Sequence, residues 1–369
     1  MYSQQELDDA VASGAITADA ANALRVHIEN QRSTVIPDEE QFRLITGFND
    51  IFVSIAAAIL LFAIGWIGQS IGQALGMVAV DRDGPSFLAP LGVAAAAWGL
   101  ATYFTAKRRM ALPSILLLLA FVGGVFMTVG FGLVQAIGEP PNDREAIYVG
   151  IVASVSGAAA AAAAWLHWKR FRVPITVAAG ALSVSAIAVG LLIAVLGDPE
   201  DYKNAILAFV LLLGVGVFLF AMWWDASDRG RLTRRSDVAF WLHLLAAPMI
   251  VHPVFTLLGL NDGHATIMEG LVVIALYIAL GVTALAIDRR ALLVSALAYV
   301  LFAMQQLFSQ FGAVELNVAL TALVIGSALL MLSAFWHQAR AAIVKPLPAN
   351  LRDKLPLIDR KVVATQPAA

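Results

Sequence analysis

Five polar side chains lie inside otherwise apolar segments of this chain. Their positions predict that they lie at a similar depth along the helices that these segments would form. They are His252, Glu269, Gln305, Gln306 and Gln310. His252 lies about 15 residues into the apolar segment 237–259, roughly 22 Å along a helix, and the adjacent glutamines lie as far into the segment 291–311. Ionisable groups at such a depth usually face a cavity or a partner. The spacing therefore predicts a water-filled, outward-facing vestibule that binds a small ligand.

A simpler interpretation of the same residues stays open. Glutamines near a helix end often reach only the lipid headgroups. Glu269 can be an ordinary carboxylate at a helix N-terminus, where the helix dipole stabilises negative charge. His252 can donate a hydrogen bond to a neighbouring backbone carbonyl. Under this interpretation the five residues share no site.

His243 and Asp50 are secondary candidates. His243 lies about 9 Å from the inner end of its segment, beside Trp241, where structural packing is favoured over a ligand role. Asp50 follows Asn49 at the start of the first apolar segment, where such residues typically cap a helix. An ion-binding role for Asp50 is the alternative.

The chain lacks the motifs of several enzyme classes. It has neither the G-x-x-x-x-G-K-[ST] loop that binds phosphates nor the H-E-x-x-H helix of zinc proteases. The run at Ser154 superficially suggests an intramembrane serine protease, but the glycine expected two residues earlier is absent. His243 and His252 face opposite sides of one helix, so they cannot bind one haem together. The chain has no cysteine, which excludes disulfides, a thiol nucleophile and a cysteine-based metal site. Because these motifs are lacking, we expect no enzyme activity, metal site or cofactor.

The composition predicts that these residues are positioned by membrane-spanning helices. Of 369 residues, 60% are apolar and 14% are charged, against roughly 25% charged residues in an average soluble domain. The first apolar run starts near Ile51. A signal peptide has its apolar core within roughly the first 30 residues, so we expect this run to be a retained span. The formal net charge of −2 gives no sign of a nucleic-acid partner.

Ten apolar segments predict an all-α bundle of ten transmembrane helices within residues 48–337, because each is long enough to cross a hydrocarbon core about 30 Å thick. The segments cover residues 50–71, 86–106, 111–137, 146–167, 173–196, 204–224, 237–259, 266–287, 291–311 and 316–337.

The distribution of basic residues predicts the orientation of the bundle. Of the 24 Lys and Arg residues, all but Arg82, Arg144 and Lys203 lie in the two ends and in alternate loops. Cytoplasmic loops carry an excess of Lys and Arg. Both ends are therefore predicted in the cytoplasm, the second end being a tail over residues 338–369 whose prolines prevent one continuous helix.

Residues 1–47 predict a soluble cytoplasmic helical hairpin. Two short helices fit the pattern, at Gln4–Val11 and Asp19–Asn30. Gly14 suits the end of the first helix, and Thr17 suits the N-cap of the second. Such a segment is a candidate binding site for a cytoplasmic protein partner.

Small residues predict close helix packing in the segment 146–167. Gly150, Ser154, Ala158 and Ala162 recur at a spacing of four within an alanine-rich run. Lipid gives no hydrophobic drive between helices, so small residues that allow two backbones to approach contribute much of the packing. We interpret this stripe as packing rather than as a functional site.

Several stretches together resemble a known group of proteins. They are Leu7–Ile28 with Gly14-Ala15-Ile16-Thr17, Gly47-Phe48-Asn49-Asp50-Ile51-Phe52, Asp237-Val238-Ala239-Phe240-Trp241-Leu242-His243 through His252-Pro253, and the tail with Trp336-His337, Pro348 and Leu355-Pro356. The chain resembles bacterial predicted multi-pass membrane proteins grouped under a domain of unknown function. The resemblance implies a bacterial inner-membrane location and no assigned activity, and it transfers no functional residue.

The expected function is that of a transporter-like or small-ligand-binding membrane protein. Ten spans with both ends inside can form two five-helix halves of inverted topology, as in many secondary transporters. The alternative is a non-transporting scaffold or sensor that acts through residues 1–47. An intramembrane enzyme acting on a lipid is a third class, which would need a converging acid–base set.

Overall fold

The computed structural model describes residues 10–24, 48–79, 84–138, 144–231, 233–259, 267–290, 293, 297, 301 and 317–357. Residues 10–24 belong to one compact unit, and Leu44–Ile358 form a second. In the first unit, Gly14 adopts a left-handed φ of 73° between two helical stretches. Thr17 Oγ1 then accepts a hydrogen bond from the Ala20 amide at 3.2 Å, as an N-cap does.

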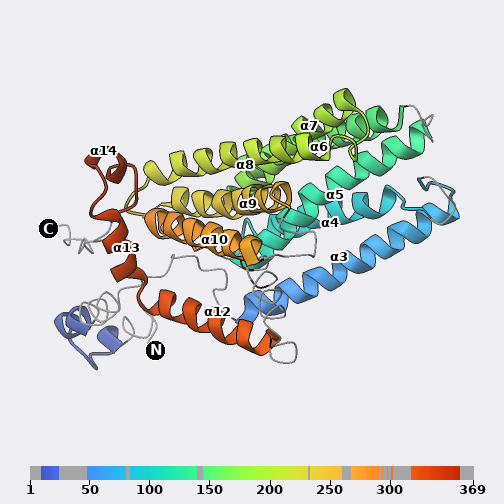
Figure 1. The fold of residues 1–369 in the computed structure, drawn as a ribbon. Helices are drawn as coiled ribbons and strands as arrows, with labels where there is room; N and C mark the ends of the chain where they lie inside the picture. Colours follow the sequence, from blue (N-terminus) through green and yellow to red (C-terminus); the bar gives the residue numbers. More distant parts are fainter. Residues whose placement is uncertain are drawn as a thin grey trace. The chain divides into compact units, whose positions relative to one another are not determined.

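The secondary-structure elements in the described residues of the second unit are all α-helices (Figure 1). Its helices are α3 (Phe48–Ala74), α4 (Leu88–Phe104), α5 (Ala111–Ile137), α6 (Glu145–Phe171), α7 (Ile175–Leu196), α8 (Lys203–Ala226), α9 (Arg234–Leu257), α10 (Ile267–Ile287), α12 (Asn317–Ala334), α13 (Trp336–Val344) and α14 (Ala349–Arg352).

Six of these helices, α3 and α5 to α9, are long and apolar enough to cross a membrane. A seventh span is counted if α12 and α13 are taken together. Large apolar side chains cover much of the outer surface, among them Phe62 at 70% exposure and Leu330 at 74%. These features confirm an all-α protein whose helices suit a membrane. The predicted segment 291–311 lies almost wholly outside the described residues.

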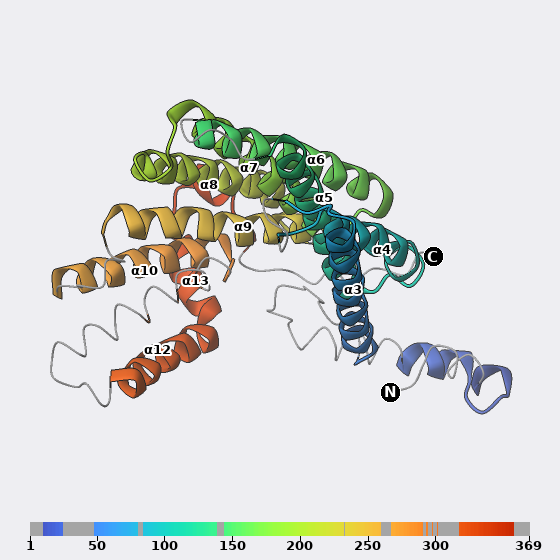
Figure 2. The ribbon, with the colours of Figure 1, turned by 90° about the vertical axis from the view of Figure 1, so that its right-hand side faces the viewer.

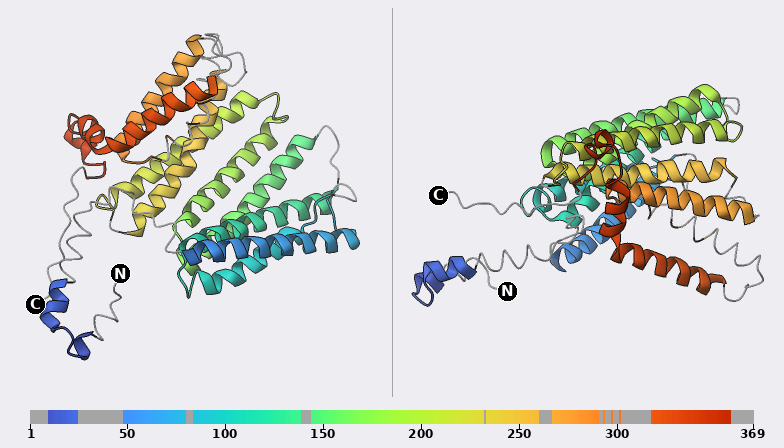
Figure 3. Two further views of the ribbon diagram at one scale, coloured as in Figure 1. Left: turned by 90° about the horizontal axis from the view of Figure 1, so that it is seen from below. Right: turned by 60° about the vertical axis from the view of Figure 1, so that its left-hand side comes forward.

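Neighbouring helices in the chain also pack against each other in space. Helix α3 contacts α4 and α5, α6 contacts α7, and α8 contacts α9 (Figure 2 and Figure 3). Helix α9 also contacts α7. The α8–α9 pair is therefore joined to the helices that precede it through α7.

The last predicted segment, 316–337, differs from the structure at its end. Helix α12 stops at Ala334, and α13 continues at an angle of 72° (Figure 1). Trp336, Arg340 and Val344 are buried at one-turn spacing along α13. The bend turns this buried face of α13 toward the other helices instead of continuing along α12.

The contact between α6 and α7 depends on glycines, as the small-residue stripe predicted. A Cβ atom built on Gly150 would lie 2.4 Å from the Gly190 carbonyl oxygen. Ser154 Oγ donates to the Gly150 carbonyl at 2.7 Å and lies 3.2 Å from the Ile187 carbonyl oxygen. The two backbones therefore touch here without intervening side chains.

The stripe prediction was wrong for Ala158 and Ala162, which are exposed. A spacing of four residues advances about 40° beyond a full turn at each step, so a fixed spacing of four leaves the contact face. The buried face of α6 passes instead through Gly157 and Ala160.

We expect Gly150→Ala to destabilise the protein by about 1–3 kcal/mol, because the added methyl group overlaps a backbone oxygen. The matched control is Gly216→Ala, at an exposed position of α8 with no atom within 4 Å of the new Cβ. This control should be neutral or slightly stabilising, since alanine favours a helix more than glycine does. Unfolding in mixed detergent micelles measures both. Equal effects of the two substitutions would contradict the contact.

Candidate functional site

The predicted vestibule is only partly covered by the structure. His252 is exposed on α9, and its backbone carbonyl accepts a hydrogen bond from Thr256 Oγ1 at 2.9 Å. Glu269 belongs to α10, but its side chain lies outside the described part of the chain, as do Gln305, Gln306 and Gln310 altogether. Convergence of these five residues on one cavity stays a prediction.

Asp50 lies in the first turn of α3 and is buried, at 3% exposure. Its backbone carbonyl accepts a hydrogen bond from Ser54 Oγ at 2.7 Å. The first turn of a helix is where the helix dipole stabilises a carboxylate. The helix already begins at Phe48, and both the capping role and the ion-binding role of Asp50 stay predictions.

His243 is part of a buried ion cluster, which consists of Asp225, His243, Arg289 and the Ser236 carbonyl. The Arg289 side chain holds the Asp225 carboxylate at two points, with Nη2 at 2.6 Å from Oδ1 and Nε at 3.2 Å from Oδ2. His243 Nε2 lies 3.2 Å from the same Oδ2. Arg289 Nη2 also donates to the Ser236 carbonyl at 3.0 Å.

The buried ion cluster joins three segments that are far apart in the sequence. Asp225 is in the last turn of α8, His243 is in α9, and Arg289 follows α10. All three residues are at most 1% exposed. Removing one partner from such a pair leaves an uncompensated buried charge, which is strongly destabilising. The three segments are therefore held together at this end of the bundle.

A helix C-cap aims Arg289 into the bundle. Asp288 follows α10 with a left-handed φ of 57°, in the position that glycine usually takes at a helix end. The Arg289 amide then donates back to the Ala284 carbonyl at 2.9 Å. This reversal of the chain directs the next side chain toward α8 and α9 instead of toward solvent.

The Asp288 side chain organises a second set of contacts. It accepts hydrogen bonds from Arg231 Nη1 at 3.0 Å and from Trp336 Nε1 at 2.8 Å. Arg231 Nη2 also donates to the Ile287 carbonyl at 2.9 Å. The connection between α8 and α9 is thus tied to the end of α10 and, through Trp336, to α13.

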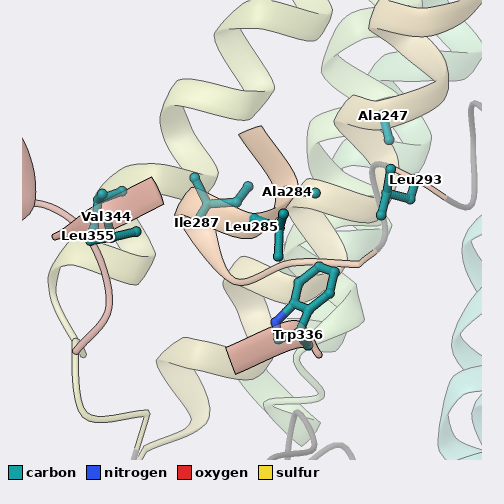
Figure 4. Close-up of a cluster of buried hydrophobic side chains, with 8 residues drawn as sticks. All are labelled: Ala247, Ala284, Leu285, Ile287, Leu293, Trp336, Val344 and Leu355. Atoms are coloured by element: carbon teal, nitrogen blue, oxygen red, sulfur yellow. The ribbon is translucent and has the colours of Figure 1, made fainter. Parts of the chain in front are cut away.

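Two arginines hold the chain after α13 at the same end. Arg340 Nη2 donates to the Pro356 carbonyl at 2.7 Å, and Arg229 Nε donates to the Leu355 carbonyl at 3.0 Å. Beside these contacts lies a cluster of buried apolar side chains, drawn in Figure 4. It consists of Ala247, Ala284, Leu285, Ile287, Leu293, Trp336, Val344 and Leu355.

Sequence reasoning missed the buried ion cluster because nothing in the sequence distinguishes Arg289 from the other basic residues of the predicted cytoplasmic loops. The available signal was Asp225, an acidic residue in the last turn of an apolar helix. Negative charge is unfavourable at a helix C-terminus, so a buried aspartate there needs a cation. Its partner, 64 residues later, follows no pattern visible in the sequence.

The buried ion cluster is built from paired charges, the Asp225 carboxylate with the Arg289 guanidinium. Among the described residues, no group of three or more His, Cys, Asp or Glu side chains could hold a metal ion. His243 Nδ1 has no hydrogen-bond partner within the described residues.

Comparison with known protein families, curated proteins and solved structures finds no match to this chain. The resemblance to bacterial multi-pass proteins therefore stays a prediction. The function has to be argued from the residues and their contacts.

We expect neutralisation of one partner, Asp225→Asn or Arg289→Gln, to lower the free energy of unfolding by about 3–5 kcal/mol, because the other charge stays buried. Replacing both, Asp225→Leu with Arg289→Met, should cost less than either single change, since no unpaired charge remains. Unfolding in mixed micelles measures the series.

The control for this series is Arg235→Gln, which removes an exposed charge at the same end of the protein. It should change the free energy of unfolding by no more than about 0.5 kcal/mol. A doubly substituted protein that is less stable than both single variants would contradict the prediction that an unpaired buried charge causes the loss of stability.

Proposed function

We propose that this chain is a bacterial inner-membrane protein with ten spans and both ends in the cytoplasm. The six long apolar helices support a membrane location. The alternating distribution of Lys and Arg supports the orientation. In this arrangement the buried ion cluster lies toward the cytoplasmic end of the bundle, because its neighbours Arg229, Arg235 and Arg290 belong to cytoplasmic connections.

Its proposed activity is transporter-like movement of a small ligand, with the buried ion cluster as the cytoplasmic gate. The observation that carries this proposal is the complete burial of Asp225, His243 and Arg289 among apolar helices. Ionisable groups within membrane spans are costly and typically mark ion or substrate pathways.

Helix α9 has the features of an element that bends. It contains Pro248 and Pro253 inside its length. A proline within a helix removes a backbone hydrogen bond and favours a kink. The part of α9 that carries His243 lies before both prolines, and His252 lies between them. Bending at the prolines would therefore move the buried ion cluster relative to the predicted outer vestibule.

Opening of the gate would require Asp225 and Arg289 to separate without leaving two bare charges. A proton on Asp225 would neutralise the carboxylate after separation. Alternatively, a small charged ligand that takes the place of one partner would neutralise the charge of the other. The two alternatives share one requirement, which is access from the cytoplasm to the space beside the pair. Accessibility near the pair is therefore the property to measure.

The second candidate is a scaffold or sensor that binds a cytoplasmic protein through residues 1–47. It is favoured by the assignment of residues 10–24 to a unit separate from the helices at Leu44–Ile358. In that case the buried ion cluster would be static and would only stabilise the bundle.

Single cysteines can test the gate cleanly, because the chain has no cysteine of its own. Ala239→Cys places a thiol at a fully buried position of α9, one turn from Ser236 and from His243. We expect its reaction with a membrane-impermeant maleimide to be slow. Arg289→Lys keeps the charge but loses the two-point contact, so it should accelerate the reaction on the order of tenfold.

Reference cysteines fix the side and the integrity of the protein in the same experiment. Ser227→Cys should react only from the cytoplasmic face and Glu200→Cys only from the outer face, both at rates that Arg289→Lys leaves unchanged. The faster reaction of the cysteine at 239 should occur only from the cytoplasmic face. If Arg289→Lys has no effect there, the cluster is static and the scaffold candidate is favoured.

A further inference from the structure

A pocket of about 170 Å³ lies between α10 and the α12–α13 bend. Its lining residues are Tyr277, Arg290, Leu293, Leu297, Leu329, Leu332, Ser333 and Trp336. The wall is almost entirely apolar because four leucines and the Trp336 ring form most of it. A dry apolar cavity of about 150 Å³ is large enough to hold a benzene-sized group.

One charged side chain, Arg290, stands at this pocket. Its guanidinium lies over the Trp336 ring, 4.8 Å from the ring centre. Within the described residues Arg290 has no carboxylate partner and no hydrogen bond. It is also only partly buried, so its charge remains available to a ligand.

The carboxylates of Asp288 and Asp225 already pair with cations other than Arg290. Asp288 is held by Arg231 at 3.0 Å, and Asp225 is held by Arg289 at 2.6 Å. Arg340 lies near Asp288 as well, at 3.8 Å. These two carboxylates therefore already face three arginines, Arg231, Arg289 and Arg340, before Arg290 is added.

Two hydroxyl groups add hydrogen-bonding capacity to the same pocket. The Tyr277 hydroxyl is buried and has no partner among the described residues. Ser333 has an exposed side chain at the end of α12. A guanidinium with two hydroxyl groups beside an apolar cavity suits a ligand with an anionic head and a hydrocarbon chain.

We propose that this pocket binds an anionic phospholipid, with the phosphate at Arg290 and part of an acyl chain between the leucines. A tryptophan and an arginine at a helix end are typical of the membrane interface, where headgroups lie. Basic pockets between spanning helices are known binding places for anionic headgroups. The exposed apolar residues Leu330 and Met331 of α12 would place the pocket within reach of the bilayer.

A lipid in this pocket would contact α10, α12 and α13 together. Trp336 touches both the pocket and, through its indole nitrogen, the Asp288 carboxylate. The bound lipid would thus stabilise the α12–α13 bend at the point where it joins the end of α10. This inference does not depend on a transport activity and goes beyond the gate.

The test is native mass spectrometry of the full-length protein released from nanodiscs, with phosphatidylglycerol or phosphatidylcholine as the probe. We expect one phosphatidylglycerol to remain bound and phosphatidylcholine to be lost. Arg290→Gln should reduce the retained phosphatidylglycerol on the order of fivefold. The matched control, Arg234→Gln, removes an exposed charge at the start of α9 and should leave retention unchanged.

Two further arms separate the headgroup from the chain. Leu332→Trp fills the pocket while keeping Arg290, and it should also reduce phosphatidylglycerol retention. Inorganic phosphate alone should not displace the bound lipid at millimolar concentration. Equal retention of the two lipids by the unchanged protein would overturn the proposal, and this comparison needs no variant to fold. Undiminished retention in both Arg290→Gln and Leu332→Trp would overturn it as well.

Discussion

The positive charge of a guanidinium buried among apolar helices must be balanced by a negative charge and by hydrogen bonds from its neighbours. This constraint governs the described structure around Arg289. Its charge is balanced by Asp225, which in turn contacts His243. Because the partners come from α8, α9 and the residue after α10, none of these segments can move far without exposing a bare charge. The left-handed residue Asp288 makes this possible, since it turns the chain so that Arg289 points inward. The Asp288 carboxylate also accepts a hydrogen bond from the Trp336 indole of α13.

Two kinds of contact therefore hold this helical unit. In the α6–α7 pair the backbones touch at Gly150 and Gly190, so the contact has little freedom to rearrange. At the ends of α8 and α10 the contact depends on ion pairs and hydrogen bonds that can be exchanged for water, a proton or another charged group. A motion of the protein is expected where contacts can be exchanged, at the buried ion cluster and not between α6 and α7.

The sequence predicted the membrane character and several helices well, for a physical reason. Apolar runs of spanning length are bounded by charged or glycine-containing loops, and so α5 begins and ends where the pattern placed it, at Ala111 and Ile137. The bend before Trp336 was not predicted, because apolar residues continue through it. The buried ion cluster was not predicted either, since positive charge at a loop looks the same in a sequence whether it meets water or a buried aspartate.

The most direct test of this account is a distance measurement across the buried ion cluster. Spin labels at Ser227→Cys and Gln338→Cys, both exposed positions in a chain without other cysteines, report on the connection after α8 and on α13. Pulsed electron spin resonance should give one narrow distance distribution in the unchanged protein. With Arg289→Lys, a second population at longer distance should appear. An unchanged single distribution in that variant, or a broad one in the unchanged protein, would contradict the claim that the Asp225–Arg289 pair holds this end closed.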